Sequence, residues 1–102
     1  MSRLDKLQDL LVVDPTDSFT RYAIGLEFAK AENFVEAIRV LEDLRERDPE
    51  YVPTYYMLAG YYRFTGDTDS AKLIYREGMA MAKKANDRHA LSELESALDE
   101  IE

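Results

Sequence analysis

The feature that most restricts the fold of this chain is an internal repeat of 34 residues. When the sequence is shifted by that distance, it aligns with itself without a gap. Identical pairs include Asp14 and Asp48, Pro15 and Pro49, Thr20 and Thr54, Tyr22 and Tyr56, and Ala37 and Ala71. Repeats of this length are typical of solenoids, in which each unit packs on its neighbours.

Apolar spacing and turn residues predict six helices joined by short turns. Helical spacing is clear between residues 34 and 44, where the apolar side chains lie three or four positions apart. Proline disfavours helix in the residue before it, so Pro15 and Pro49 should each follow a helix end. The other predicted boundary residues are Asp17 or Ser18, Asn33 with Glu36, Gly66, Asp67, Asn86 and Asp87.

These residues resemble the tetratricopeptide repeat, whose pattern is W-x2-L-G-x2-Y, then A-x3-F, then P. The first copy has Ile24, Gly25, Phe28, Ala37, Leu41 and Pro49 at pattern positions. The second copy has Tyr55, Leu58, Ala59, Tyr62, Ala71 and Tyr75. The resemblance implies an all-α solenoid of about six helices, made of antiparallel hairpins in a right-handed superhelical stack.

The chain departs from the pattern at two positions. Arg21 stands where the first copy should have a large aromatic residue, so we expect Phe19 or Tyr22 to fill part of that volume. Lys83 replaces the proline that should end the second copy, so we expect that helix to continue toward Ala85.

The resemblance predicts one domain over residues 1–102. Its expected parts are an N-terminal half-repeat helix (1–14), a first full repeat (18–51), a second full repeat (52–85) and a C-terminal capping helix (87–102). A terminal helix with one polar face is what such arrays use to cover their last apolar surface.

Composition excludes several classes of function. Without cysteine, the chain has no disulfide and no thiol chemistry. The net charge of −8 disfavours a nucleic-acid partner. Three explanations of this charge remain open, namely solubility, a basic partner and a salt-rich habitat. The sequence has no apolar run of the roughly 20 residues that span a bilayer, and no signal peptide, so we expect a cytoplasmic protein without a membrane partner.

The resemblance also implies a concave groove, lined by the first helix of each hairpin. The candidate groove residues are Phe19, Tyr22, Leu26, Ala29 and Lys30 from the first copy, and Pro53, Tyr56, Gly60, Arg63 and Phe64 from the second. Alternatively, Tyr22 and Tyr56 only pack against a neighbouring helix. Some relatives clamp the C-terminal carboxylate of heat-shock chaperones, but Tyr22 and Leu26 replace the lysine and asparagine of that clamp, so an uncharged or mixed peptide fits better.

Nothing in the sequence indicates catalysis, a cofactor or a metal. His89 and Glu93 are one helical turn apart, but no second histidine or cysteine completes a ligand set. We therefore predict a non-catalytic adaptor or scaffold that binds a protein or peptide. The alternative is a self-association module that forms a weak homodimer through an exposed helix face at Leu4, Leu7 and Leu11.

Overall fold

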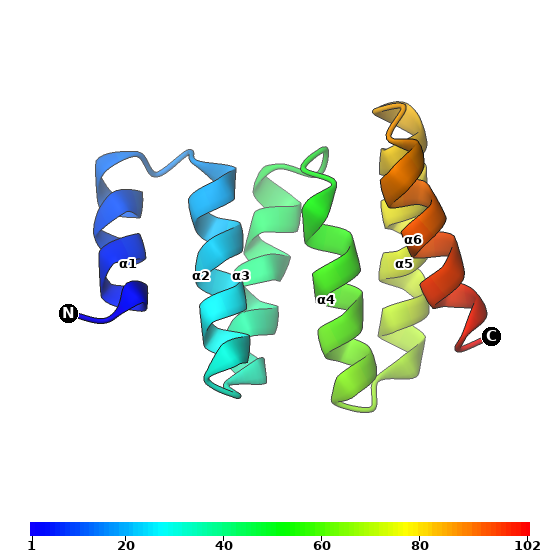
Figure 1. Ribbon diagram of the computed structural model, residues 1–102, viewed down its shortest axis with the longest axis horizontal. Helices are drawn as coiled ribbons and strands as arrows, with labels where there is room; N and C mark the ends of the chain where they lie inside the picture. The colour runs from blue at the N-terminus through cyan, green and yellow to red at the C-terminus, as the bar shows by residue number, and fades with distance from the viewer.

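The computed structural model describes residues 1–102 and contains helices and turns but no strand. Its six helices are α1 (Arg3–Val13), α2 (Ser18–Lys30), α3 (Phe34–Arg47), α4 (Pro53–Phe64), α5 (Thr68–Lys84) and α6 (Arg88–Asp99). Consecutive helices are antiparallel, and they stand side by side along the longest axis of the molecule, which measures 41 × 29 × 20 Å (Figure 1). The predicted all-α helical-repeat fold is confirmed. No helix has both the length and the apolar character needed to cross a bilayer.

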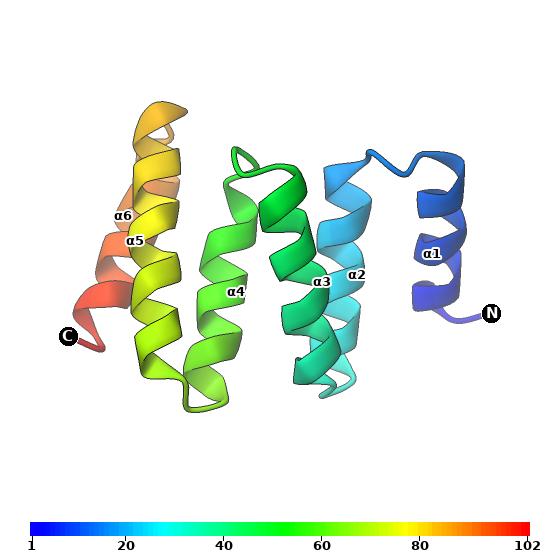
Figure 2. The same cartoon turned by 180° about the vertical axis from the view of Figure 1, so that it is seen from behind.

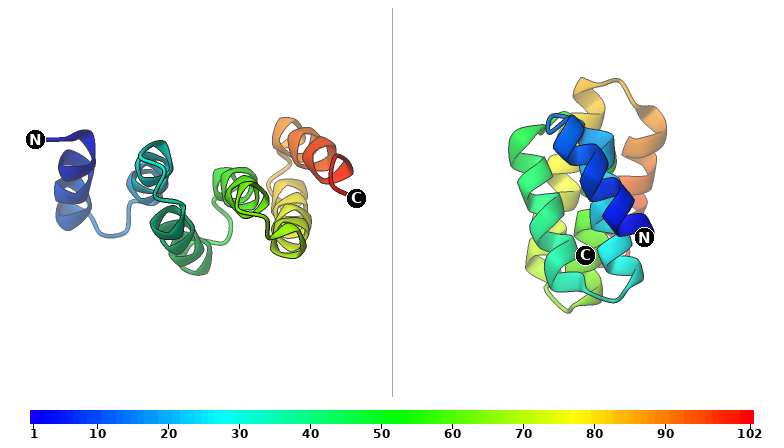
Figure 3. Two further views of the ribbon diagram at one scale, coloured as in Figure 1. Left: turned by 90° about the horizontal axis from the view of Figure 1, so that it is seen from below. Right: turned by 90° about the vertical axis from the view of Figure 1, so that its left-hand side faces the viewer.

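The helices form two layers. Each helix packs on the next one along the chain, and α2 also contacts α4, which in turn contacts α6. These three helices lie on the side that faces the viewer in Figure 1, while α3 and α5 lie behind them and come to the front in Figure 2. The left-hand view in Figure 3, from below, shows the same alternation. The layer of α2, α4 and α6 therefore presents one continuous face.

Side-chain caps begin most of the helices. The Asp67 carboxylate accepts hydrogen bonds from the backbone N–H and the hydroxyl of Ser70, at 3.1 and 2.7 Å. These bonds lower the pKa of Asp67. Asn33 Oδ1 accepts from the N–H of Glu36, as expected for a helix start, but the Glu36 carboxylate bonds to Arg39 and not to the N–H of Asn33, so the two residues do not form a reciprocal capping box. Helix α4 has no side-chain cap and begins with proline, which has no N–H to satisfy.

Small side chains allow the helices to approach closely. Ala37, Ala59 and Ala71 are 0% exposed, and a methyl group added at Gly25 would lie 2.6 Å from a methyl carbon of Leu41. The main core joins α3, α4, α5 and α6, whereas Leu7 of α1 packs in a smaller cluster on α2. The repeated alanines thus mark contacts between helices.

The N-terminal helix corrects one sequence-based expectation. Leu7 is buried, and the side chains of Leu4 and Leu11 are partly buried against Ala23 and Ile24 of α2. That face is already covered within the chain and is not open to a second copy. The helix must turn this stripe inward because α2 is its one neighbouring helix.

Arg21 takes over the role of the missing aromatic residue. Its guanidinium donates to the carbonyl of Pro15 at 2.5 Å. One period later, the Tyr55 hydroxyl donates to the carbonyl of Pro49 at the same distance. Of the two residues expected to fill part of that volume, Phe19 does not, because its side chain is 62% exposed. Tyr22 is partly buried and packs against the main core. The expected extension of the last repeat helix is present, since α5 runs to Lys84.

Candidate functional site

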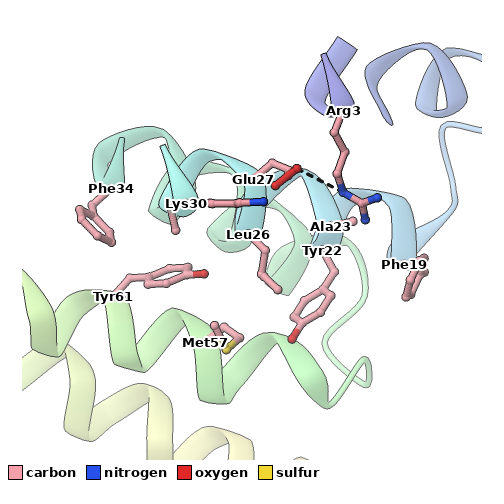
Figure 4. Close-up of a pocket in the computed structure, with 11 residues that line it drawn as sticks. Arg3, Phe19, Tyr22, Ala23, Leu26, Glu27, Lys30, Phe34, Met57 and Tyr61 are labelled. Atoms are coloured by element: carbon pink, nitrogen blue, oxygen red, sulfur yellow. Dashed lines mark ion pairs between the residues drawn. The ribbon is translucent and has the colours of Figure 1, made fainter. Parts of the chain in front are cut away.

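The first of two adjoining hollows lies between α2 and α4 and has a volume of about 540 Å³. Eight of its eleven lining residues are hydrophobic. They come mainly from α2, while Met57 and Tyr61 of α4 form the opposite wall (Figure 4). Phe34 closes one end of the hollow and Arg3 of α1 reaches its rim.

The second hollow lies between α4 and α6 and has a volume of about 430 Å³. Its walls include Pro53 and Tyr56 of α4 and Glu93 and Leu94 of α6. Tyr22 and Met57 line both hollows, so the two hollows adjoin. We call the two together the groove. It follows the layer formed by α2, α4 and α6.

Tyr22 stands where the two hollows meet. Its ring points from α2 toward Met57 of α4 (Figure 4) and makes an edge contact with Tyr51, with ring centroids 5.9 Å apart. Burial raises the pKa of Tyr22, and the negative charge of Glu93 raises it further. The hydroxyl therefore stays protonated near neutral pH and is able to donate a hydrogen bond to a bound group.

A cluster of three aromatic rings closes the end of the first hollow that lies away from Tyr22. The rings of Phe34 and Tyr61 are 5.9 Å apart, and those of Phe34 and Phe64 are 4.7 Å apart. Burial is the main cause that raises the pKa of Tyr61 to about 12. These rings fix the shape of this end, because each ring is held by at least one other.

Charges differ between the two hollows. In the first, Arg3 pairs with Glu27 at 3.2 Å, while Lys30 is exposed and forms no ion pair. In the second, Asp87 and Glu93 supply two carboxylates. His89 Nε2 lies 3.4 Å from a Glu93 oxygen and pairs with it only when the imidazole is protonated.

The groove gathers most of the candidate residues from the sequence. Phe19, Tyr22, Leu26, Ala29 and Lys30 all line the first hollow, and Pro53 and Tyr56 line the second. Gly60, Arg63 and Phe64 line neither. Arg63 pairs with Glu100, the residue after α6, at 2.8 Å, and Phe64 packs on Phe34. The alternative that the two tyrosines serve in packing also has support, since Tyr22 packs on Tyr51 and Tyr56 packs on Tyr75.

Sequence reasoning missed Met57, Tyr61 and the α6 residues of the groove. The 34-residue shift carries Tyr22 to Tyr56, which faces α6, whereas the wall opposite Tyr22 needs the other edge of α4. That edge corresponds to Ala23 and Glu27, one period earlier. The repeat could have indicated this, because α4 is the middle helix of the layer and contributes residues to both hollows.

The groove has the features of a binding site. No three side chains among histidine, aspartate and glutamate are gathered in a way that could hold a metal ion. His89 is 87% exposed at the rim. The lining offers apolar area, phenol groups and a few charges, which suit recognition of another chain.

Comparisons with known proteins agree with the repeat pattern. The family model for the tetratricopeptide repeat matches residues 28–98. A crystal structure of a tetratricopeptide repeat domain protein from Salinibacter ruber is 39% identical, with a TM-score of 0.79, and the match covers 83% of this chain and 94% of that one. A solution structure of such a protein from the same organism is 40% identical, with a TM-score of 0.83, covering 87% and 90%.

A solution structure of a protein from Bordetella parapertussis shares the fold at 23% identity. Its TM-score is 0.84, and the match covers 99% of this chain and 88% of that one. The comparison with curated proteins gives no match. From the internal period, the paired helices and the matched family model, we conclude that the chain belongs to the tetratricopeptide repeat family.

Proposed function

We propose that this chain is a non-catalytic adaptor or scaffold module that holds a peptide segment of a partner protein in the groove. Tetratricopeptide repeats are generally protein–protein interaction modules. The observation that supports a site in the groove is the pair of adjoining hollows joined by Tyr22 and Met57. Each hollow has a volume within the range of about 300–1,000 Å³ that is typical of ligand pockets.

The side chains of the groove suit this role energetically. Removing apolar surface from water contributes about 25 cal/mol for each Å². Tyr22 offers an apolar ring with a polar tip, and it is already held by Tyr51. A side chain that is held before binding loses little rotamer freedom when a partner arrives. The groove can therefore retain much of the free energy gained by apolar contact.

The experiment uses a displayed library of random peptides sorted on the wild-type protein. We expect Tyr22→Ala and Met57→Ala to weaken capture of the enriched peptides by about tenfold, because both residues line both hollows. Titration by fluorescence anisotropy measures the affinity. Circular dichroism checks that the helices persist in each variant.

Leu73→Ala is the matched control. Leu73 lies on α5, outside both hollows, and is 67% exposed. Its truncation removes a similar apolar area without touching the groove. Equal affinities for the control and the two groove variants would contradict the proposal, as would a wild-type protein that enriches no peptide.

A further inference from the structure

The two ends of the groove carry opposite charge. Lys30 lies in the last turn of α2, lines the first hollow and has no carboxylate partner. The other charges of that hollow, Arg3 and Glu27, neutralise each other at 3.2 Å. The first hollow therefore has one free positive charge beside a lining that is mainly hydrophobic.

The α6 end of the groove is negative. Asp87 and Glu93 line the second hollow, and His89 is the one basic side chain there. The Asp87 carboxylate accepts from the N–H of Ala90 at 3.0 Å, which leaves its charge in place. Glu93 has one partner, His89, whose Nε2 lies 3.4 Å from a Glu93 oxygen. No lysine or arginine offsets these two carboxylates within the hollow.

We propose that the groove selects an extended peptide segment that is charged at both ends. A lysine or arginine of the segment lies beside Glu93 and Asp87, apolar side chains sit against Tyr22 and Met57, and an acidic group lies beside Lys30. This inference rests on the proposed function of the groove and specifies the chemistry of its partner.

The helix geometry sets the spacing of the charges on the partner. Lys30 is near the end of α2, Glu93 is near the middle of α6, and both helices run in the same direction (Figure 1). Neighbouring helix axes are about 8–10 Å apart, and a helix rises about 1.5 Å per residue. The two charges are thus separated by roughly 20 Å or slightly more, which an extended chain covers in about six or seven residues.

Charge complementarity favours this partner over segments of a single sign. A wholly acidic segment would place its charges beside Asp87 and Glu93, and the net charge of −8 would repel it. A wholly basic segment would place a charge beside Lys30, the one free positive charge of the first hollow. Opposite charges at the two ends avoid both conflicts.

The first test sequences the peptides that wild-type protein enriches from the random library. We expect a basic residue and an acidic residue about six or seven positions apart, with leucine, methionine or an aromatic residue between them. An enriched set that lacks this charge order, but still loses binding in Tyr22→Ala, would overturn the charge inference and leave the proposed function standing. A library with no enriched peptide would overturn both.

The second test reverses single charges with one enriched peptide as the probe. We expect Glu93→Lys or Lys30→Glu to weaken binding by about fivefold to twentyfold, because each replaces an attraction with a repulsion. Reversing the matching charge on the peptide should restore affinity. The matched controls are Glu95→Lys on α6 and Lys83→Glu on α5, which change the net charge equally but line neither hollow. Equal losses in variants and controls would overturn the inference.

Discussion

Two buried threonines one period apart have different hydrogen-bond partners. The Thr20 hydroxyl donates to Asp17 Oδ2 at 2.7 Å, whereas the Thr54 hydroxyl is buried without a partner. Tyr51 occupies the position in the second copy that Asp17 has in the first. Its ring packs on Tyr22 beside the groove, so the second repeat has an aromatic contact in place of a helix cap.

This difference predicts opposite effects of the same substitution. Thr54→Val should raise the free energy of unfolding by about 1 kcal/mol, because it removes a buried hydroxyl that has no hydrogen bond. Thr20→Val should lower it by about 1 kcal/mol, because it leaves Asp17 without its hydroxyl donor. Urea denaturation followed by circular dichroism measures both. A loss of stability in Thr54→Val would show that its hydroxyl has a partner in solution.

At the scale of the helix, two glycines differ in how closely a neighbouring helix approaches them. A Cβ at Gly78 of α5 would lie 2.5 Å from the Cβ of Tyr55, an atom that is fixed to the backbone of α4. A Cβ at Gly60 of α4 would meet nothing within 4 Å. Both positions are inside helices, where alanine is favoured over glycine by about 1 kcal/mol when space allows.

We therefore expect Gly78→Ala to lower the free energy of unfolding by about 1–3 kcal/mol through overpacking against Tyr55. Gly60→Ala is the matched control and should raise it by about 0.5–1 kcal/mol. Thermal and urea denaturation measure both variants. A neutral result for Gly78→Ala would mean that α5 shifts away from α4 without loss of packing.

The sequence predicts the helices well because their boundaries depend on local chemistry. Asp17, Asn33 and Asp67 each cap the helix that was expected to follow. Gly66 adopts a φ of +92°, in the left-handed region that closes a helix. These caps and the glycine act on backbone groups within one helical turn, so a single sequence is enough to predict where the helices begin and end.

Contacts between elements were harder to predict. The stripe of Leu4, Leu7 and Leu11 is visible in the sequence, but spacing alone does not say whether a stripe faces another part of the chain or solvent. The repeat pattern indicates missing core volume at Arg21, but the long side chain of Arg21 reaches the carbonyl of Pro15 as Tyr55 reaches that of Pro49. The same limit applies to the groove, because the 34-residue shift does not show that Met57 and Tyr61 lie on the edge of α4 that faces α2.

At the scale of the whole molecule, ion pairs and hydrogen bonds connect the repeats behind the groove. Arg45 of α3 pairs with Glu42 at 2.7 Å and with Glu77 of α5 at 2.8 Å. The Tyr62 hydroxyl of α4 donates to the same Glu42. This network joins three helices that belong to two successive hairpins, so it stabilises the spacing between α2 and α4 on which the first hollow depends.

The tyrosines connect this packing to the pH dependence of the whole fold. Burial is the main cause that raises the pKa of Tyr55 and of Tyr61 to about 12, compared with 10.0 for a free phenol. The folded protein holds these protons more tightly than the unfolded chain does, so their contribution to stability is complete below pH 10. It is lost as the pH rises from about 10 to about 12.

We expect the urea midpoint to fall steeply over this pH interval, and tyrosinate absorbance to rise together with loss of the helical signal. Tyr55→Phe should be less stable at neutral pH, because it lacks the hydrogen bond to the Pro49 carbonyl, but its stability should fall less between pH 10 and 12. Since Tyr61 lines the first hollow, peptide capture should weaken over the same interval. Ionisation of all seven tyrosines near pH 10 with the helices intact would contradict this account, because it would place Tyr55 and Tyr61 in water.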